Sequence, residues 1–168
     1  MKKLFLAFCF LSTALLPSFA QNKKAEREAA ALAAFEKAVA TIETKDFVII
    51  VGTYQIGGVF ETNNDNATFL AYEQDHIILQ GNLISDNNNT NKLMVSDYNQ
   101  ITDKKGNIKI SVQAKGNLIN AKIEITLKKT AGNMADVIIT PTKGEVKRFS
   151  GEVTPKAEST YFRRPGEI

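Results

Sequence analysis

The chain has 168 residues and a net charge of +3, with one cysteine and one histidine. One domain of this length can bury a hydrophobic core without disulfides or metals. Its Lys and Arg residues are balanced by acids and form no cluster, which gives no support for nucleic-acid binding, and a single histidine excludes a zinc site built on two or three histidines.

The first 20 residues have the three parts of a secretory signal peptide. Two lysines precede an apolar run over Leu4–Leu16, and small residues up to Ala20 precede the polar Gln21. The run is shorter than the ~20 residues that a membrane-spanning helix needs. We therefore predict a signal peptide over residues 1–20, cleavage after Ala20, and export to the periplasm or the extracellular space.

The only cysteine, Cys9, lies inside this segment. The mature chain would then contain no cysteine, which excludes disulfides, thiolate catalysis and cysteine-ligated metals. No later apolar run is long enough to form a transmembrane helix in the mature chain.

Residues 21–45 are predicted to form an N-terminal helix. Apolar side chains recur there at steps of three and four residues, which places them on one stripe of a helix. The stripe consists of Ala25, Ala29, Leu32, Phe35, Val39 and Ile42. We expect it to pack onto a sheet or to cap one end of it; the alternative is a partner-binding element.

Residues 46–162 are predicted to form an antiparallel β domain. Short β-branched and aromatic runs alternate there with turns rich in Gly, Asn and Asp, without helices between them. The predicted strands are Phe47–Val51, Val59–Glu61, Thr68–Tyr72, His76–Leu83, Leu93–Ile101, Ile108–Ala114, Ile119–Lys128, Met134–Thr140 and Val146–Val153.

The later strands show two-residue periodicity, with one apolar and one polar face each. In contrast, Phe47–Val51 is apolar on both faces, as expected if the helix covers its outer face. Eight or nine such strands favour a mainly β fold, an antiparallel meander closed into a lipocalin-like barrel; a two-sheet sandwich is the alternative. Residues 163–168 carry no strand or helix pattern and are expected to form a flexible tail.

Several short sequence segments resemble those of a known family. They are Lys45-Asp46-Phe47-Val48-Ile49 after the Ala-rich helix, Ser96-Asp97-Tyr98 followed by Lys104-Lys105-Gly106-Asn107, Lys143-Gly144 through Ser150-Gly151, and Tyr161-Phe162. From about Ala30 onward, the chain resembles the small exported domains of unknown function of Bacteroidetes bacteria. The resemblance implies an exported β domain without an established activity, and it supplies no catalytic residues.

The sequence contains no recognisable catalytic motif. His76 beside Asp75 could act as a general base, but no nucleophile accompanies it, and the position favours an ordinary residue at a turn. The Asn-rich loops 63–66 and 86–91 hold one carboxylate each, which favours turns over a calcium site. We predict no enzyme activity, no metal and no cofactor.

Aromatic residues on the predicted strands provide the one functional hint. In a small barrel they either fill the interior or line a ligand cavity. The candidate ligand-binding residues are Tyr54, Phe60, Phe69, Tyr72, Tyr98 and Phe149. The sequence thus predicts an exported, non-enzymatic domain that holds a small apolar or amphipathic ligand in a barrel mouth; the alternative is an envelope structural or protein-interaction module.

Overall fold

The computed structural model describes residues 16–168, with side chains from Lys23 onward. Most of the predicted signal peptide, Cys9 included, lies outside the described residues, and its last five residues form the start of the first helix. None of the helices in the described range has a stretch long and apolar enough to cross a membrane.

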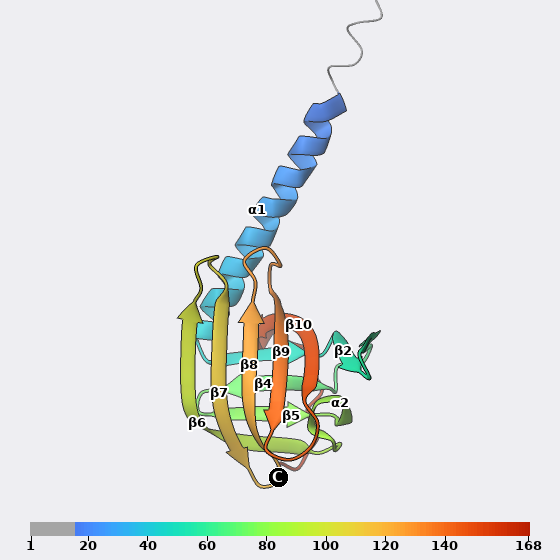
Figure 1. Cartoon of the computed structure of the whole chain (residues 1–168), viewed down its shortest axis with the longest axis vertical. Coiled ribbons are helices and arrows are strands. Elements are labelled where there is room, and N and C mark those ends of the chain that lie inside the picture. Colours follow the sequence, from blue (N-terminus) through green and yellow to red (C-terminus); the bar gives the residue numbers. More distant parts are fainter. Residues whose placement is uncertain (1–15) are drawn as a thin grey trace, which may run out of the picture.

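The described residues form one long helix, ten strands and two short helical turns (Figure 1). The elements are α1 (Leu16–Glu43), β1 (Asp46–Ile50), β2 (Thr53–Ile56), β3 (Val59–Thr62), β4 (Phe69–Glu73), β5 (His76–Gln80), α2 (Asn82–Ser85), β6 (Thr90–Thr102), β7 (Ile108–Gly116), β8 (Asn120–Leu127), β9 (Met134–Pro141), β10 (Lys147–Pro155) and the 3₁₀ turn η1 (Lys156–Glu158).

Eight of the strands close into an antiparallel barrel in the order β1-β4-β5-β6-β7-β8-β9-β10, because β1 also pairs with β10. At this seam a Cβ atom on Gly151 would overlap the carbonyl oxygen of Ile50, so only glycine allows the two strands to approach. The predicted lipocalin-like barrel is confirmed, and β2 and β3 form a hairpin outside the ring that pairs with β10 through β2.

Inward-facing apolar residues from all eight barrel strands fill the interior. The last two turns of α1 close one end of the barrel, where Phe35, Ala38 and Ile42 are buried in this core. The first half of the predicted stripe differs, because Ala25, Ala29 and Leu32 are exposed on a part of α1 that extends away from the barrel (Figure 1). The helix therefore caps one barrel end with its C-terminal half alone.

A second apolar cluster lies on the outer face of β1, β4 and β5, where Val48, Phe69 and Ile78 are fully buried. The ring of Tyr161 covers it and meets the ring of Phe69 edge-on, with centroids 4.6 Å apart. The expectation that the helix covers this face is wrong, since the C-terminal segment covers it instead. As predicted, β1 is apolar on both faces because both faces are buried. Its outer face, however, is covered by the segment around Tyr161 and not by α1.

Hydrogen bonds hold the last residues against the barrel. The buried Gln80 side chain donates to the carbonyl of Phe162 (2.8 Å) and accepts from the backbone N–H of Arg164 (2.8 Å). Ile168 exchanges backbone hydrogen bonds with Thr90 and Lys92 of β6. Residues 163–168 were expected to be a flexible tail, whereas these contacts place them along the part of β6 that β7 does not reach.

Ion pairs fasten the same segment near the helix-capped end. The Glu73 carboxylate lies 2.6 Å from the Lys156 ammonium and 2.8 Å from a guanidinium nitrogen of Arg163, which also pairs with Glu167. Because Glu73 is mostly buried, these contacts are screened less than surface pairs. The C-terminal segment, residues 156–168, thus contacts the outer cluster through Tyr161 and is also attached to β4 and β6.

Two elements differ from the predicted strands. β2 was expected to be a connection, and α2 occupies the end of the predicted strand His76–Leu83. At Gly81 the backbone has φ of 106°, which glycine adopts readily and other residues do not, so the strand ends there and the chain turns into α2.

Candidate functional site

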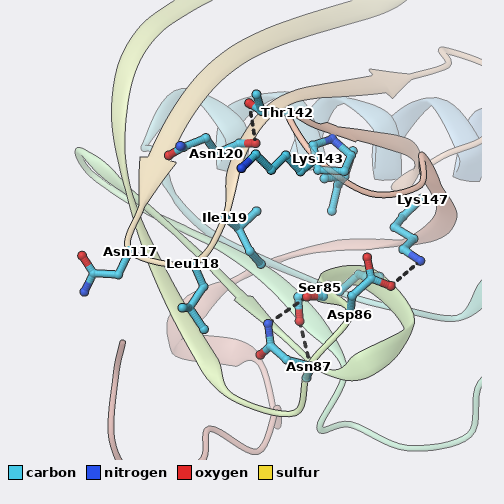
Figure 2. A pocket seen from close by; sticks show the side chains of 13 residues that line it. Ser85, Asp86, Asn87, Asn117, Leu118, Ile119, Asn120, Thr142, Lys143 and Lys147 are labelled. Atoms are coloured by element: carbon cyan, nitrogen blue, oxygen red, sulfur yellow. Dashed lines mark hydrogen bonds and ion pairs between the residues drawn. The ribbon is translucent and has the colours of Figure 1, made fainter.

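The barrel end opposite α1 has a hollow of about 430 Å³ at its mouth (Figure 2). Three connections surround it: α2 with the residues that follow it, the β7–β8 turn, and the β9–β10 loop. The lining residues are Ile84, Ser85, Asp86, Asn87, Asn117, Leu118, Ile119, Asn120, Ile139, Pro141, Thr142, Lys143 and Lys147.

The floor of this mouth hollow is apolar. Ile84 and Ile139 are buried and belong to the barrel core, and the half-buried Ile119 packs against it. Leu118 is 64% exposed at the wall, and Figure 2 shows Ile119 pointing into the hollow beside it. The surface thus offers an aliphatic ligand contact with the outer layer of the core.

The segment after α2 forms a rigid wall. Asp86 adopts a left-handed backbone conformation with φ of 55°, which ends α2. The Ser85 hydroxyl donates to the carbonyl of Gly81 (2.8 Å), and the Asn87 amide donates to the carbonyl of Ser85 (2.8 Å). These local bonds fix the turn without a ligand.

The opposite wall joins two loops. Both the backbone N–H and the hydroxyl of Thr142 donate to the carbonyl of Asn120, at 2.8 and 3.1 Å. This link holds the β7–β8 turn against the β9–β10 loop, so Asn120 and Thr142 stay at the rim. The hollow is therefore shaped by hydrogen-bonded connections on both sides.

Charged groups lie at the rim. The Lys147 ammonium is 2.6 Å from the Asp86 carboxylate, and this pair closes one side of the hollow. Figure 2 shows the Lys143 side chain running along another side toward Asn120. Within residues 16–168, no carboxylate lies within ion-pair distance of Lys143, so its charge is available to an anionic group.

The six aromatic residues predicted to bind a ligand occupy three separate places. Tyr72, Tyr98 and Phe149 contribute to the core, where Tyr72 contacts Phe47 and Tyr98 with centroids 5.5 and 5.9 Å away. Burial raises the pKa of Tyr72 to about 12. Phe69 lies in the outer cluster, and Tyr54 and Phe60 lie on the β2–β3 hairpin. The structure does not bring the six together, and none of them lines the mouth hollow.

Of the residues that do line it, only Asp86 and Asn87 were considered as site candidates from the sequence, as part of the Asn-rich loop 86–91, and the rest were missed. Leu118 and Ile119 follow the Asn117 turn and look like an ordinary strand start, and Lys143 sits in a turn with Gly144. A large apolar residue directly after a Gly-Asn turn was the available signal. Their convergence depends on which barrel end each connection occupies, and a linear pattern does not show that.

The other sequence candidates have local roles. The Nδ1 atom of His76 lies 2.5 Å from the Asp75 carboxylate at the β4–β5 turn, away from the mouth hollow. The Asp65 carboxylate accepts hydrogen bonds from the backbone N–H groups of Ala67 and Thr68 (2.9 and 3.0 Å), as a turn residue does. Over residues 16–168, no group of three His, Cys, Asp or Glu side chains is placed to hold a metal ion.

The chain is similar to a solved structure, a DUF4251 family protein from Bacteroides eggerthii DSM 20697. The two chains are 27% identical with a TM-score of 0.67, and the match covers 79% of this chain and 94% of that chain. No family model matches the sequence, and no curated protein matches it. The similarity supports the predicted resemblance to a domain of unknown function from Bacteroidetes.

Proposed function

We propose that this protein is a non-enzymatic binding domain that holds a small amphipathic anion in the mouth hollow. The observation that carries the proposal is the arrangement of groups there: buried isoleucines form the floor, while amides and an ammonium without a carboxylate partner in the described chain form the rim. Ligand sites commonly combine such an apolar lining with a few convergent polar groups.

The dimensions favour a small ligand. A hollow of about 430 Å³ lies in the lower part of the range of known ligand pockets. An aliphatic chain would contact Ile84, Ile119 and Leu118, and a carboxylate would accept hydrogen bonds from Lys143 and the Asn120 amide. Since the barrel interior is filled, the chain would lie across the mouth rather than along the barrel axis.

The proposal includes the compartment. We place the protein outside the cytoplasm, on the signal-peptide pattern of residues 1–20. Expression in a Bacteroides host followed by fractionation and N-terminal sequencing tests it. The mature protein should begin at Gln21 and appear in the periplasm or the medium; an intact Met1 terminus on cytoplasmic protein would contradict it.

Calorimetric titration with decanoate tests ligand binding, because this probe has one carboxylate and an aliphatic chain. Decanoate should bind, and decanol and decyltrimethylammonium should bind about tenfold more weakly, since they lack the charge that pairs with Lys143. Leu118→Ser and Lys143→Gln should each weaken decanoate binding several-fold. Both positions are exposed, so both variants should fold.

Matched controls use the opposite barrel end. Leu32→Ser and Lys129→Gln make the same chemical changes at exposed positions on α1 and after β8. Both should leave decanoate affinity unchanged. Equal effects of the mouth and control variants, or no decanoate binding, would refute the proposal.

A further inference from the structure

The β2–β3 hairpin leaves an open sheet edge. It stands outside the closed ring, at the right of Figure 1, and β3 is the last strand of the ten-stranded order. All four residues of β3 are exposed. The side chains of Ile56, Val59 and Phe60 are 55%, 63% and 68% exposed, so the open edge is also apolar.

The hairpin register shows which backbone groups are free. Gly57 and Gly58 both have positive φ and form a two-residue turn between the paired Ile56 and Val59. At the hairpin base, the N–H of Asn63 donates to the carbonyl of Gly52 (2.8 Å). Because hydrogen-bonded pairs alternate in antiparallel strands, the N–H and C=O groups of residues 60 and 62 point away from β2.

A groove of about 740 Å³ continues from this edge along the hairpin base. Its walls come from the end of β3, the 63–66 loop and the outer face of β10. Strand alternation places the Phe60 side chain on the same hairpin face as Thr62, which lines the groove. The edge and the groove therefore form one continuous surface, which we call the hairpin groove.

The hairpin groove is lined by acidic side chains and by no basic ones. Asp65 and Glu152 are among its lining residues, which include no Lys and no Arg. Glu61 lies outside the groove, because strand alternation places it on the opposite hairpin face, where it accepts a hydrogen bond from the Tyr54 hydroxyl (2.7 Å). The two carboxylates in the lining therefore make the groove acidic. Such a surface favours a basic ligand over an acidic one.

We propose that the hairpin groove binds an extended, Lys- or Arg-bearing segment of a partner protein, which adds to β3 as a further strand. The backbone groups of Phe60 and Thr62 would pair with the segment, and its basic side chains would lie near Glu152 and Asp65. In this recognition mode the main chain provides affinity and the side chains provide specificity. A second copy of β3 fits less well, because it would bring acidic groups together.

A fluorescent, end-blocked peptide of alternating Val and Lys, six residues long, is a suitable probe in an anisotropy titration. It should bind the protein, and the same peptide with Glu in place of Lys should bind at least about tenfold more weakly. A version N-methylated at alternate amides should also lose binding, because it cannot pair with a strand edge. This last arm tests backbone pairing without altering the protein.

Variants locate the site. Thr62→Pro removes an outward-facing N–H while keeping the bonds between β2 and β3, so it should abolish peptide binding in a folded protein. Glu152→Lys should weaken binding about fivefold or more. The control Glu36→Lys makes the same charge change on the exposed face of α1 and should have no effect.

Three outcomes would overturn the proposal: equal binding of the Lys and Glu peptides, binding that survives both N-methylation and Thr62→Pro, or no binding. Sedimentation that shows a dimer lost in Thr62→Pro would assign the edge to a second copy and would also overturn it. Decanoate binding at the mouth should be the same in all these variants.

Discussion

The two ends of the barrel are closed in different ways. At one end, α1 lays Phe35, Ala38 and Ile42 onto the core and seals it. At the other end, α2 contributes only the buried Ile84 and the partly buried Leu83, and hydrogen-bonded turns surround a hollow that remains open. A long amphipathic helix can cover a barrel end, whereas a four-residue helix covers only part of it. The difference shows that α1 extends the core at the sealed end, whereas the open end keeps the hollow that the proposed ligand would occupy.

The largest expected effect lies at the sealed end. Ile42→Ala removes a fully buried side chain, which should lower the free energy of unfolding by about 2–5 kcal/mol through lost burial and a cavity. Urea denaturation measures it. A loss below about 1 kcal/mol would mean that α1 does not seal this end.

Removing the ion pairs of Glu73, near the sealed end, should have the next largest effect on the free energy of unfolding. Glu73→Gln should cost about 2 kcal/mol, because Lys156 and Arg163 lose the mostly buried negative charge with which they pair. Burial alone would raise the pKa of Glu73, but the hydrogen bond from Lys156 and the charge of Arg163 outweigh it and lower the pKa below its usual value. The stabilisation is therefore present above the usual glutamate pKa and is lost as pH falls through the lowered one.

Asp86→Asn at the mouth provides the contrast. The Asp86 carboxylate is more exposed than that of Glu73, so breaking its pair with Lys147 should cost less than 1 kcal/mol. Urea denaturation at pH 7 and pH 3 measures both variants. Equal costs would show that the two ends hold their ion pairs equally well.

Deprotonation of Tyr72 at high pH should lower the free energy of unfolding. Because burial raises the pKa of Tyr72 to about 12, the folded state keeps the proton that the unfolded chain loses near pH 10. Stability is full below pH 10 and falls as pH rises toward 12, by roughly 1 kcal/mol at pH 11. Urea denaturation from pH 8 to pH 11 measures it, and Tyr72→Phe should reduce this loss. An unchanged slope in that variant would place the effect elsewhere.

The smallest effect on stability should occur at the open end. Leu118→Ala changes an exposed side chain and should alter the free energy of unfolding by less than about 0.5 kcal/mol. The same variant should weaken decanoate binding. A large loss of stability would show that Leu118 is part of the core and would remove the contrast between the ends.

The barrel itself could be predicted from the sequence. Alternation over β7 and β8 predicted one inward and one outward face, and the structure confirms this for Ile108, Ile110 and Val112 among others. The strand β2 was missed because it has only four residues, and Gln55 and Ile56 were interpreted together with Gly57 and Gly58 as a connection.

The covering of the barrel could not be predicted in the same way. A strand that is apolar on both faces requires a second cover, but its pattern does not say which segment supplies it. The Tyr161 ring meets Phe69 from 92 positions further along the chain. The mouth hollow was missed for the same reason, because it forms where three connections meet at one barrel end.

Closure of the ring by its first and last strands has a kinetic consequence. Phe47 of β1 pairs with Pro155 of β10, so nearly the whole domain separates the two partners. Contacts between such distant positions slow folding, because the chain must lose much of its entropy before they form. During synthesis β1 emerges more than 100 residues before its partner, and the ring can close only after Pro155 of β10 has left the ribosome.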